Sequence, residues 1–176
     1  NPDVLDVATG TADLALAVMK LDPASVTGVD ISRNMLDIGR KKVNDRGLEN
    51  RIKLMEGDSE NLPFDSLRFD VAMAAFGVRN FADPLKGLRE MNRVLREGGL
   101  IMVLEFSKPS AFPFRNIYNF YFLRILPFVG RLFSKDKSAY TYLPESVMRF
   151  PDNEDFLALL RSAGFVSAAQ VKLSGG

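Results

Sequence analysis

The sequence predicts an α/β protein with a doubly wound, Rossmann-like sheet that is mostly parallel and has helices on both faces. Strand-like and helix-like stretches alternate about every 25 residues, which is typical of parallel strands joined by crossover helices. The chain opens on an apolar run at residues 4–7, breaks into a loop of small residues, and meets a second run that ends in Asp30. No repeat or low-complexity linker interrupts this alternation, so we predict a single domain over residues 1–176.

The first half of the chain contains three expected strands and two expected helices. The second helix begins with Ser32 as its N-cap and stops near Gly47. A third strand follows at residues 52–56. Four residues recur at helical spacing and are expected to lie on the side of the second helix that faces the core: Met35, Leu36, Gly39 and Val43.

The second half of the chain continues the same alternation. A fourth strand is expected at residues 69–76, followed by a helix that starts at Asp83-Pro84, with proline in its first turn. We expect residues 97–99 to close that helix and residues 100–106 to form the fifth strand. The remaining expected elements are a helix at residues 153–163 that ends at Gly164 and a final strand near residues 166–173.

Composition places the chain among globular proteins and excludes several kinds of site. Hydrophobic residues make up 47% of the 176 residues and the formal net charge is +1, so we expect a full core and no bulk polyanion binding. The chain has no cysteine and no histidine, which excludes disulfides and thiolate metal sites and disfavours a transition-metal site or a histidine base, so we expect no metal site. The chain starts at Asn1-Pro2 and stops just after an apolar run, so we expect segments missing at both ends.

The loop after the first strand indicates which cofactor the sheet binds. Residues 8–13 lack the first and last glycines of the G-x-G-x-x-G pattern, which disfavours NAD. Asp6 stands just before this loop and would repel a pyrophosphate, whereas the sulfonium of S-adenosylmethionine suits a carboxylate there. The alternative is that residues 8–11 are only a tight strand-to-helix turn.

The residues just after each strand are the candidate cofactor contacts, because ligands lie at the carboxyl ends of such sheets. We expect Asp30 to accept both hydroxyls of a ribose. Asp58 is the candidate for the adenine amino group and the Ser59 backbone N–H for a ring nitrogen, although both residues are also ordinary turn formers. The full set of candidate cofactor contacts is Asp6, Ala8, Gly10, Thr11, Asp30, Asp58, Ser59 and Ala75.

One long segment carries a family resemblance. Residues 93–109, Arg-Val-Leu-Arg-Glu-Gly-Gly-Leu-Ile-Met-Val-Leu-Glu-Phe-Ser-Lys-Pro, together with the upstream Phe-Gly-Val-Arg-Asn at residues 76–80, resemble the UbiE/COQ5 quinone C-methyltransferases. The resemblance covers nearly the whole chain. Two positions depart from the family pattern: Glu97 stands where proline is usual and Ala12 stands where glycine is usual.

The resemblance implies a class I methyltransferase fold and contacts from Thr11, Asp30, Asp58 and Ser59 to S-adenosylmethionine. The implied activity is methylation of a ring carbon of a prenylated hydroquinone, in the synthesis of menaquinone or ubiquinone. S-adenosylmethionine carries a good leaving group, so such an enzyme mainly aligns the methyl group and makes the ring carbon nucleophilic. Loss of a proton from the neighbouring phenol makes the ring carbon nucleophilic.

Four residues are candidates for contact with the reacting ring. Arg79 stands just after the fourth strand and would stabilise a phenolate oxygen, while Asn80 would orient the hydroxyl or a water. The alternative for Arg79 is a surface residue that anchors the next helix. Tyr140 and Tyr142 would bring phenol groups to the substrate or else pack in the core.

Residues 109–150 are expected to form an inserted, aromatic-rich lid over the substrate site. The part at residues 109–135 has many aromatic residues, and all of its charges are basic. These charges interrupt every apolar run well before the roughly 20 residues that a membrane span needs. The lid would receive an isoprenoid tail, and it either contacts an anionic membrane surface or packs on the domain or on a second copy of the chain.

We therefore expect a cytoplasmic enzyme that acts at a membrane face on a prenylated quinol, with no nucleic-acid partner. The sequence leaves three questions open: whether the ring is a naphthoquinol or a benzoquinol, which group accepts the proton, and whether the protein forms a homo-oligomer. One rival is methylation of another hydrophobic small molecule, such as a sterol. A second rival is a non-catalytic subunit that binds S-adenosylmethionine and scaffolds a quinone-synthesis assembly.

Overall fold

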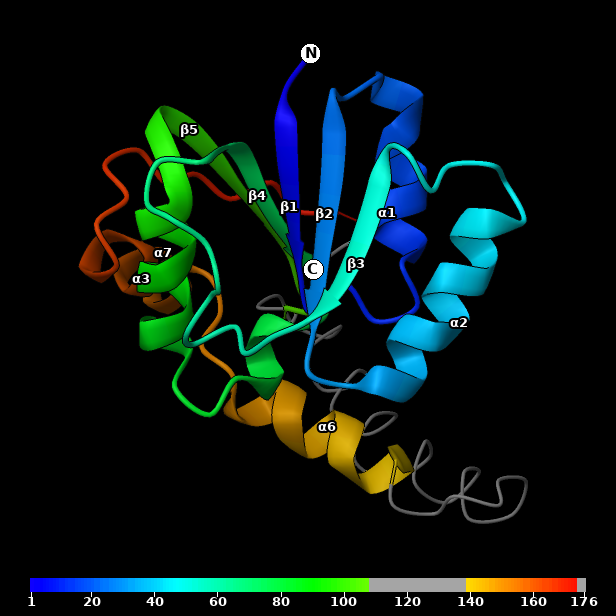
Figure 1. The fold of residues 1–176 in the computed structure, drawn as a ribbon. Helices are drawn as coiled ribbons and strands as arrows, with labels where there is room; N and C mark the ends of the chain where they lie inside the picture. The colour runs from blue at the N-terminus through cyan, green and yellow to red at the C-terminus, as the bar shows by residue number, and fades with distance from the viewer. Residues whose placement is uncertain (108–138, 174–176) are drawn as a thin grey trace. The chain divides into compact units, whose positions relative to one another are not determined.

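The centre of the fold is a parallel sheet of five strands. A computed structural model describes residues 1–107 and 139–173. The strands lie in the order β3-β2-β1-β4-β5, and every neighbouring pair runs parallel (Figure 1). The strands are β1 (Asp3–Val7), β2 (Ser25–Asp30), β3 (Ile52–Glu56), β4 (Phe69–Ala75) and β5 (Leu95–Leu104). The strand order reverses between β1 and β4, which is where open parallel sheets bind ligands.

Helices alternate with the strands, as the sequence predicted. After β1 and β2 come α1 and α2, while α3 connects β4 to β5. The described helices and 3₁₀ turns are α1 (Asp13–Val18), η1 (Met19–Leu21), α2 (Arg33–Asn44), η2 (Val78–Asn80), α3 (Pro84–Val94), α6 (Ala139–Arg149) and α7 (Glu154–Ser162).

Both faces of the central strands are covered. Val4 and Val26 pack on one face in a cluster with Ala15 of α1 and Val43 of α2. Leu5, which points to the other face of β1, is also completely buried. Figure 1 shows α3 on the opposite side of the sheet from α1. The predicted doubly wound architecture is confirmed.

Two helix starts follow the predicted capping. The Ser32 side chain accepts a hydrogen bond from the N–H of Met35 at 3.5 Å, and the Asp83 side chain accepts one from the N–H of Lys86 at 3.1 Å. Pro84 occupies the first turn of α3. The expectation for Met35 was wrong, because its side chain is 43% exposed and lines a cavity rather than the core.

The boundary between α3 and β5 differs from the prediction. The helix ends at Val94 and the strand already begins at Leu95, so residues 97–99 belong to β5 and do not close the helix. The register between β4 and β5 shifts between Phe69 and Val71, and Gly98 takes a left-handed φ of +75° there. A bulge absorbs the extra residues, which a helical pattern in the sequence cannot reveal.

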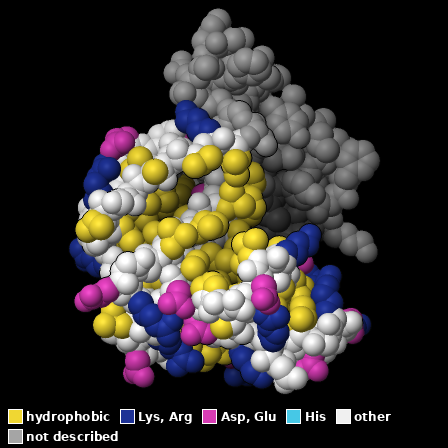
Figure 2. All heavy atoms as spheres, turned by 90° about the horizontal axis from the view of Figure 1, so that it is seen from above, with side chains coloured by type: hydrophobic (Ala, Val, Ile, Leu, Met, Phe, Trp, Pro, Cys, Tyr) yellow, Lys and Arg dark blue, Asp and Glu magenta, His cyan; other side chains and the backbone are white. Residues whose placement is uncertain are grey.

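Strand β5 presents apolar side chains to the outside. Its alternate residues Leu100, Met102 and Leu104 are 55%, 56% and 39% exposed, in contrast to the buried residues of β1. Figure 2 shows hydrophobic side chains gathered on one face of the molecule. Within the described sheet, β5 is the last strand and has one paired neighbour.

The expected strand near residues 166–173 is not formed. These residues have no regular secondary structure, and Val166 and Val171 are 97% and 80% exposed. Residues in an extended segment need a neighbouring strand to pair their backbone groups, and no described strand pairs with this segment. The apolar pattern alone therefore misled the prediction.

Two compact units divide the chain. The first contains residues 1–105 and 162–166 and holds the whole sheet, while the second contains residues 106–161 and 167–176. Within the second unit, the rings of Phe150 and Phe156 lie 5.3 Å apart between centroids. Most of the predicted lid, residues 109–138 of 109–150, lies outside the described residues.

Candidate functional site

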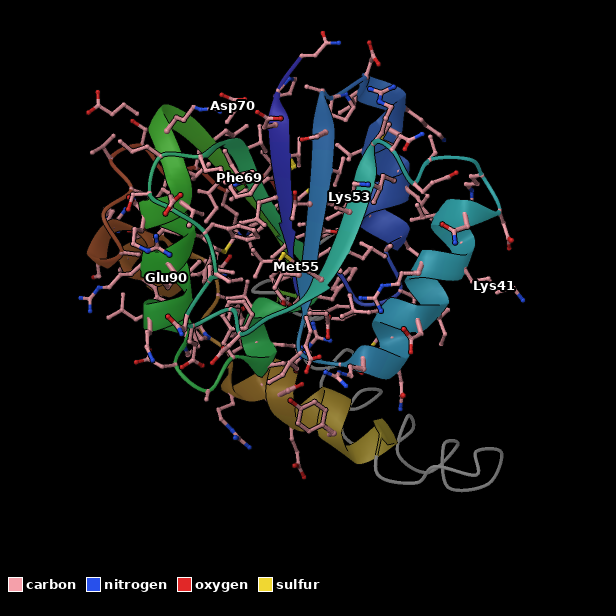
Figure 3. The ribbon with its side chains drawn as sticks, in the orientation of Figure 1. Lys41, Lys53, Met55, Phe69, Asp70 and Glu90 are labelled. Atoms are coloured by element: carbon pink, nitrogen blue, oxygen red, sulfur yellow. The ribbon has the colours of Figure 1, made fainter. Side chains whose placement is uncertain are left out.

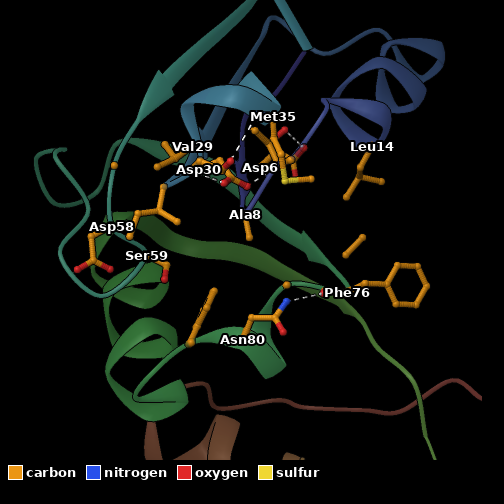
Figure 4. A pocket seen from close by; sticks show the side chains of 18 of the residues that line it. Asp6, Ala8, Leu14, Val29, Asp30, Met35, Asp58, Ser59, Phe76 and Asn80 are labelled. Atoms are coloured by element: carbon orange, nitrogen blue, oxygen red, sulfur yellow. Dashed lines mark hydrogen bonds between the residues drawn. The ribbon is translucent and has the colours of Figure 1, made fainter. Parts of the chain in front are cut away.

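A cavity of about 950 Å³ lies at the carboxyl ends of β1, β2 and β4 (Figure 4). Small-molecule sites typically occupy roughly 300–1,000 Å³, so the cavity has room for a ligand of cofactor size. Its position is the one that the strand order predicts. Nine of the twelve predicted site residues line it: Asp6, Ala8, Gly10, Asp30, Asp58, Ser59, Ala75, Arg79 and Asn80.

The loop after β1 brings its backbone close to the cavity. Ala8, Gly10 and Ala12 take left-handed φ angles of +56°, +56° and +62°, which only glycine adopts without strain. The methyl group of Ala12 is accommodated by Gly39 of α2, where an added Cβ would lie 3.2 Å from it. The alanine that departs from the family pattern therefore fits because the facing helix has a glycine.

Asp30 connects the loop after β1 to the start of α2. The Gly10 N–H donates to Oδ2 and the Ser32 N–H donates to Oδ1, each at 2.8 Å (Figure 4). Each carboxylate oxygen can accept a further hydrogen bond. The Asp30 carboxylate thus has a fixed orientation at the cavity wall and retains capacity for the hydroxyl groups of a ligand.

Asp6 is a buried carboxyl group beside the cavity. It is 1% exposed, and the Thr9 hydroxyl donates a hydrogen bond to Oδ2 at 2.6 Å. Burial raises the pKa of Asp6 from 3.8 to about 7, against the lowering effect of the hydrogen bonds from Thr9 and the Ala15 backbone. The negative charge of Asp30 adds to the increase in this pKa. A cation bound in the cavity would favour the ionised form of Asp6.

We expect Asp6→Asn to flatten the dependence of folding stability on pH. The folded protein holds the Asp6 proton up to about pH 7, whereas the unfolded chain releases it near pH 3.8. The protonated group therefore stabilises the fold at low pH, and this contribution is lost between these values as the pH rises, by up to about 1.4 kcal/mol per pH unit. Urea unfolding at several pH values between 4 and 8 measures the difference between the two proteins.

The matched control is Asp45→Asn, which neutralises an exposed carboxylate after α2. Its stability profile should run parallel to that of the wild type. A profile for Asp6→Asn that is also parallel to the wild type would contradict the buried, protonated state of Asp6.

The loop between β3 and β4 supplies Asp58 and Ser59. Both residues line the cavity. Asp58 also shapes its own loop, because its Oδ1 accepts from the N–H of Glu60 at 2.8 Å and its carbonyl accepts from the N–H of Asn61 at 3.1 Å. Asp58 is therefore both a turn-forming residue and a residue that lines the cavity. The contacts of Asp58 and Ser59 with adenine stay a prediction.

Two side chains of α3 hold that loop in place. Glu90 accepts from the N–H of Leu62 at 2.9 Å, and Figure 3 shows Glu90 on α3 beside the loop. Arg93 donates to the carbonyls of Phe64 at 2.7 Å and Leu62 at 3.0 Å, and it also pairs with Glu90 at 2.7 Å. Neither Glu90 nor Arg93 lines the cavity. They act on the site only through the loop that carries Asp58.

We expect Arg93→Ala to destabilise the fold by about 2 kcal/mol. The partly buried backbone carbonyls of Leu62 and Phe64 would lose a charged hydrogen-bond donor, and so would Glu90. The looser loop should also weaken binding of S-adenosylmethionine severalfold. Thermal unfolding and calorimetry measure the two effects. Arg89→Ala removes an exposed arginine from the same helix and serves as the control. Equal unfolding temperatures for both variants would disprove this role.

The segment after β4 completes the cavity. Phe76 has a left-handed φ of +56°, and its carbonyl accepts from the Asn80 side chain at 3.4 Å (Figure 4). Gly77 packs directly against Ala8, since an added Cβ would lie 2.5 Å from the Ala8 methyl. Strained backbone of this kind often occurs at functional sites. The close approach places Arg79 and Asn80 beside the loop after β1.

Arg79 is held by an acidic residue that the sequence analysis did not select. Its Nη1 donates to Glu105 Oε2 at 2.8 Å, and only 11% of the Arg79 side chain and 7% of the Glu105 side chain are exposed. Arg79 is therefore not the surface residue of the alternative interpretation. The sequence did contain a signal that could have identified Glu105, because it is a carboxylate that directly follows the apolar run of β5.

Thr11 is not among the described residues that line the cavity. The Thr11 hydroxyl instead donates to Asp13 at 2.7 Å and accepts from Lys42 Nζ at 2.9 Å, because these charged groups hold it at the start of α1. Tyr142 on α6 is 55% exposed. Tyr140 belongs to α6, but its side chain lies outside the described part of the chain. Both tyrosine roles stay predictions.

Comparison with known proteins decides the family. The ubiE/COQ5 methyltransferase family matches residues 1–176, the full length of the chain. The chain belongs to the UbiE/COQ5 methyltransferase family. The resemblance found in residues 76–80 and 93–109 is thus confirmed, and the chain is a methyltransferase.

Named relatives agree with this family, and a solved structure shares the fold. The chain is 48% identical over 173 residues to the demethylmenaquinone methyltransferase of Porphyromonas gingivalis, covering 97% of this chain and 71% of that protein. It is 46% identical over 175 residues to the ubiquinone/menaquinone biosynthesis C-methyltransferase UbiE of Geobacter sp. strain M21, covering 98% and 74%. An S-adenosylmethionine-dependent methyltransferase structure from Thermotoga maritima shares the fold at 23% identity and a TM-score of 0.64, over 95% of this chain and 65% of that one.

The described helices of this UbiE/COQ5 chain are too short or too polar to cross a membrane. Within residues 1–107 and 139–173, no helix has both the length and the apolar character needed to cross a bilayer. The expected contact with a membrane surface is a separate matter, and the lid segment for which it was predicted lies largely outside the described residues.

Proposed function

We propose that the chain transfers a methyl group from S-adenosylmethionine to a ring carbon of a prenylated hydroquinone, as a late step in menaquinone or ubiquinone synthesis. The observation that carries this proposal is the cavity at the strand ends, which joins Asp30 at one side to Arg79 and Asn80 at the other. The names of the related demethylmenaquinone and UbiE methyltransferases support the substrate class.

The cavity residues suit the chemical groups of S-adenosylmethionine. Asp30 offers a fixed carboxylate to the ribose hydroxyls, and Asp58 and Ser59 line the side where the adenine would lie. Asp30 places a carboxylate in the wall, which suits a sulfonium and opposes a pyrophosphate, and a bound sulfonium would favour the ionised form of Asp6. When bound, S-adenosylmethionine supplies an electrophilic methyl group with a good leaving group.

The residues after β4 would prepare the ring for attack. A phenol next to the target carbon makes that carbon nucleophilic once its proton leaves. The Arg79 guanidinium would stabilise the phenolate oxygen and Asn80 would orient the hydroxyl group, since both line the cavity. Because the chain has no histidine, the proton would go to water or to a carboxylate.

The position of the enzyme follows from the chemistry of its substrate. A prenylated quinol dissolves in a membrane, so we expect the protein to act peripherally at the cytoplasmic membrane face. The basic and aromatic residues 109–135 are the segment from which we infer this contact.

Mass spectrometry of reaction products tests the proposed function. The protein is incubated in detergent with S-adenosylmethionine and either reduced demethylmenaquinone or the corresponding demethylated ubiquinone precursor. We expect one methyl group to be added to a ring carbon, and the preferred quinol identifies the pathway. If S-adenosylmethionine binds and neither quinol gains a methyl group, the quinol assignment is wrong and another lipid or a scaffolding role replaces it.

A further inference from the structure

An ion pair joins Arg79, which lines the cavity, to Glu105, which does not. Arg79 belongs to η2 and lines the cavity, whereas Glu105 follows the last residue of β5 and does not line it. Glu105 can therefore affect a bound molecule through Arg79, the residue that it holds.

Glu105 contacts both the side chain and the backbone of Arg79. Arg79 Nη1 donates to Oε2 at 2.8 Å, and the Arg79 backbone N–H donates to Oε1 at 3.3 Å. One carboxylate thus fixes the position of η2 and the direction of the guanidinium at the same time. On the other side, the Phe76 ring centroid lies 5.9 Å from the Arg79 Cζ atom, within the range of a cation–π contact.

Burial makes this pair electrostatically important. The two side chains are 11% and 7% exposed, so water screens their charges weakly. Removal of one partner takes a charge-assisted hydrogen bond away from the other. The Glu105 carboxylate also offsets part of the positive charge that Arg79 presents to the cavity.

We propose that Glu105 is a positioning residue that aims the Arg79 guanidinium into the cavity and sets the positive charge acting on the phenol of the substrate. The proposal rests on the proposed function, because it is the ring hydroxyl of a hydroquinone that Arg79 would contact. It predicts that Glu105 controls the pH at which the bound phenol loses its proton, although Glu105 itself does not touch the substrate.

Two substitutions separate the charge of Glu105 from its shape. Glu105→Gln keeps the shape and removes the negative charge, so Arg79 should stabilise the phenolate more strongly. We expect the acid limb of the kcat profile to move down by about one pH unit. Glu105→Asp keeps the charge on a shorter side chain, so kcat should fall while the acid limb stays in place.

The other charged groups of the cavity do not change between these variants. Among the described residues that line the cavity, these groups are Asp6 of β1, Asp13 of α1, Asp30 of β2, and Asp58 and Glu60 of the loop after β3. Glu97→Gln removes an exposed carboxylate from β5 and is the matched control for a change in net charge. Profiles of Glu105→Gln and Glu97→Gln that both superimpose on the wild type would overturn the control of the phenol by Glu105.

A measurement without turnover tests the positioning by itself. In ¹⁵N NMR spectra of the wild type, the Arg79 Nη protons should give separate signals because the ion pair restricts rotation, and Arg79→Lys identifies these signals. Glu105→Ala should merge or broaden them. Unchanged signals in Glu105→Ala would overturn the proposal. A wild type that methylates no quinol would instead overturn the proposed function, since the NMR result does not depend on the substrate.

Discussion

Asp30→Ala is expected to weaken binding of S-adenosylmethionine by at least tenfold, equivalent to about 1.4 kcal/mol. The substitution removes the carboxylate that we expect to accept the ribose hydroxyls. It also frees the N–H groups of Gly10 and Ser32, which both donate to this carboxylate at 2.8 Å. The loop after β1 and the start of α2 thus lose their shared anchor. Isothermal titration calorimetry measures the change in affinity.

The control for Asp30→Ala is Asp37→Ala, which removes an exposed carboxylate on the next helix, α2. Its affinity for S-adenosylmethionine should match that of the wild type. Asp30 both anchors the N–H groups of Gly10 and Ser32 and is expected to accept the ribose hydroxyls. Asp30→Asn separates these roles, because its single amide oxygen can still accept from one of the two N–H groups while the negative charge for the ribose is lost. An unchanged affinity in Asp30→Ala would remove Asp30 from the cofactor site.

Arg79→Ala is expected to lower kcat by about 100-fold, the typical loss when a donor to a developing oxyanion is removed. The affinity for S-adenosylmethionine should stay near that of the wild type, since we propose that Arg79 contacts the ring of the substrate and not the cofactor. Arg79→Lys keeps a positive charge for Glu105 and should lose less activity. Steady-state kinetics with the quinol, beside calorimetry with the cofactor, measures both effects.

A folding defect must be separated from a catalytic one in Arg79→Ala, because the substitution leaves the buried Glu105 without its guanidinium partner. Thermal unfolding of Arg79→Ala and Arg79→Lys makes this separation. Arg46→Ala removes an exposed arginine near the end of α2 and should not affect kcat. Full turnover in a folded Arg79→Ala protein would dismiss the proposed role of Arg79.

The order of the elements was predictable from local sequence signals. The run at residues 52–56 coincides with β3, and Asp83 with Pro84 starts α3 as expected. Apolar runs, caps and proline act within a few residues, so a single sequence displays them. Elements that depend on pairing were less predictable, and the expected strand at residues 166–173 failed for that reason.

The candidate site was predictable where it follows from strand ends. Asp30 and Ala75 end β2 and β4, and both line the cavity as expected. Thr11 was selected from the same loop as Gly10, but Lys42 and Asp13 hold its side chain elsewhere. The direction of a side chain depends on partners far away in the sequence, and local patterns do not contain that information.

The sequence by itself determined the alternation of strands and helices, the acidic and small residues at the strand ends, and the family of the chain. Only the tertiary structure decided which of these residues share a cavity and which residues hold them. Arg93 fixes the loop of Asp58 across 31 residues, and Glu105 fixes Arg79 across 26. Such contacts arise when separate strands and helices pack together, because packing brings distant charged groups within hydrogen-bonding distance.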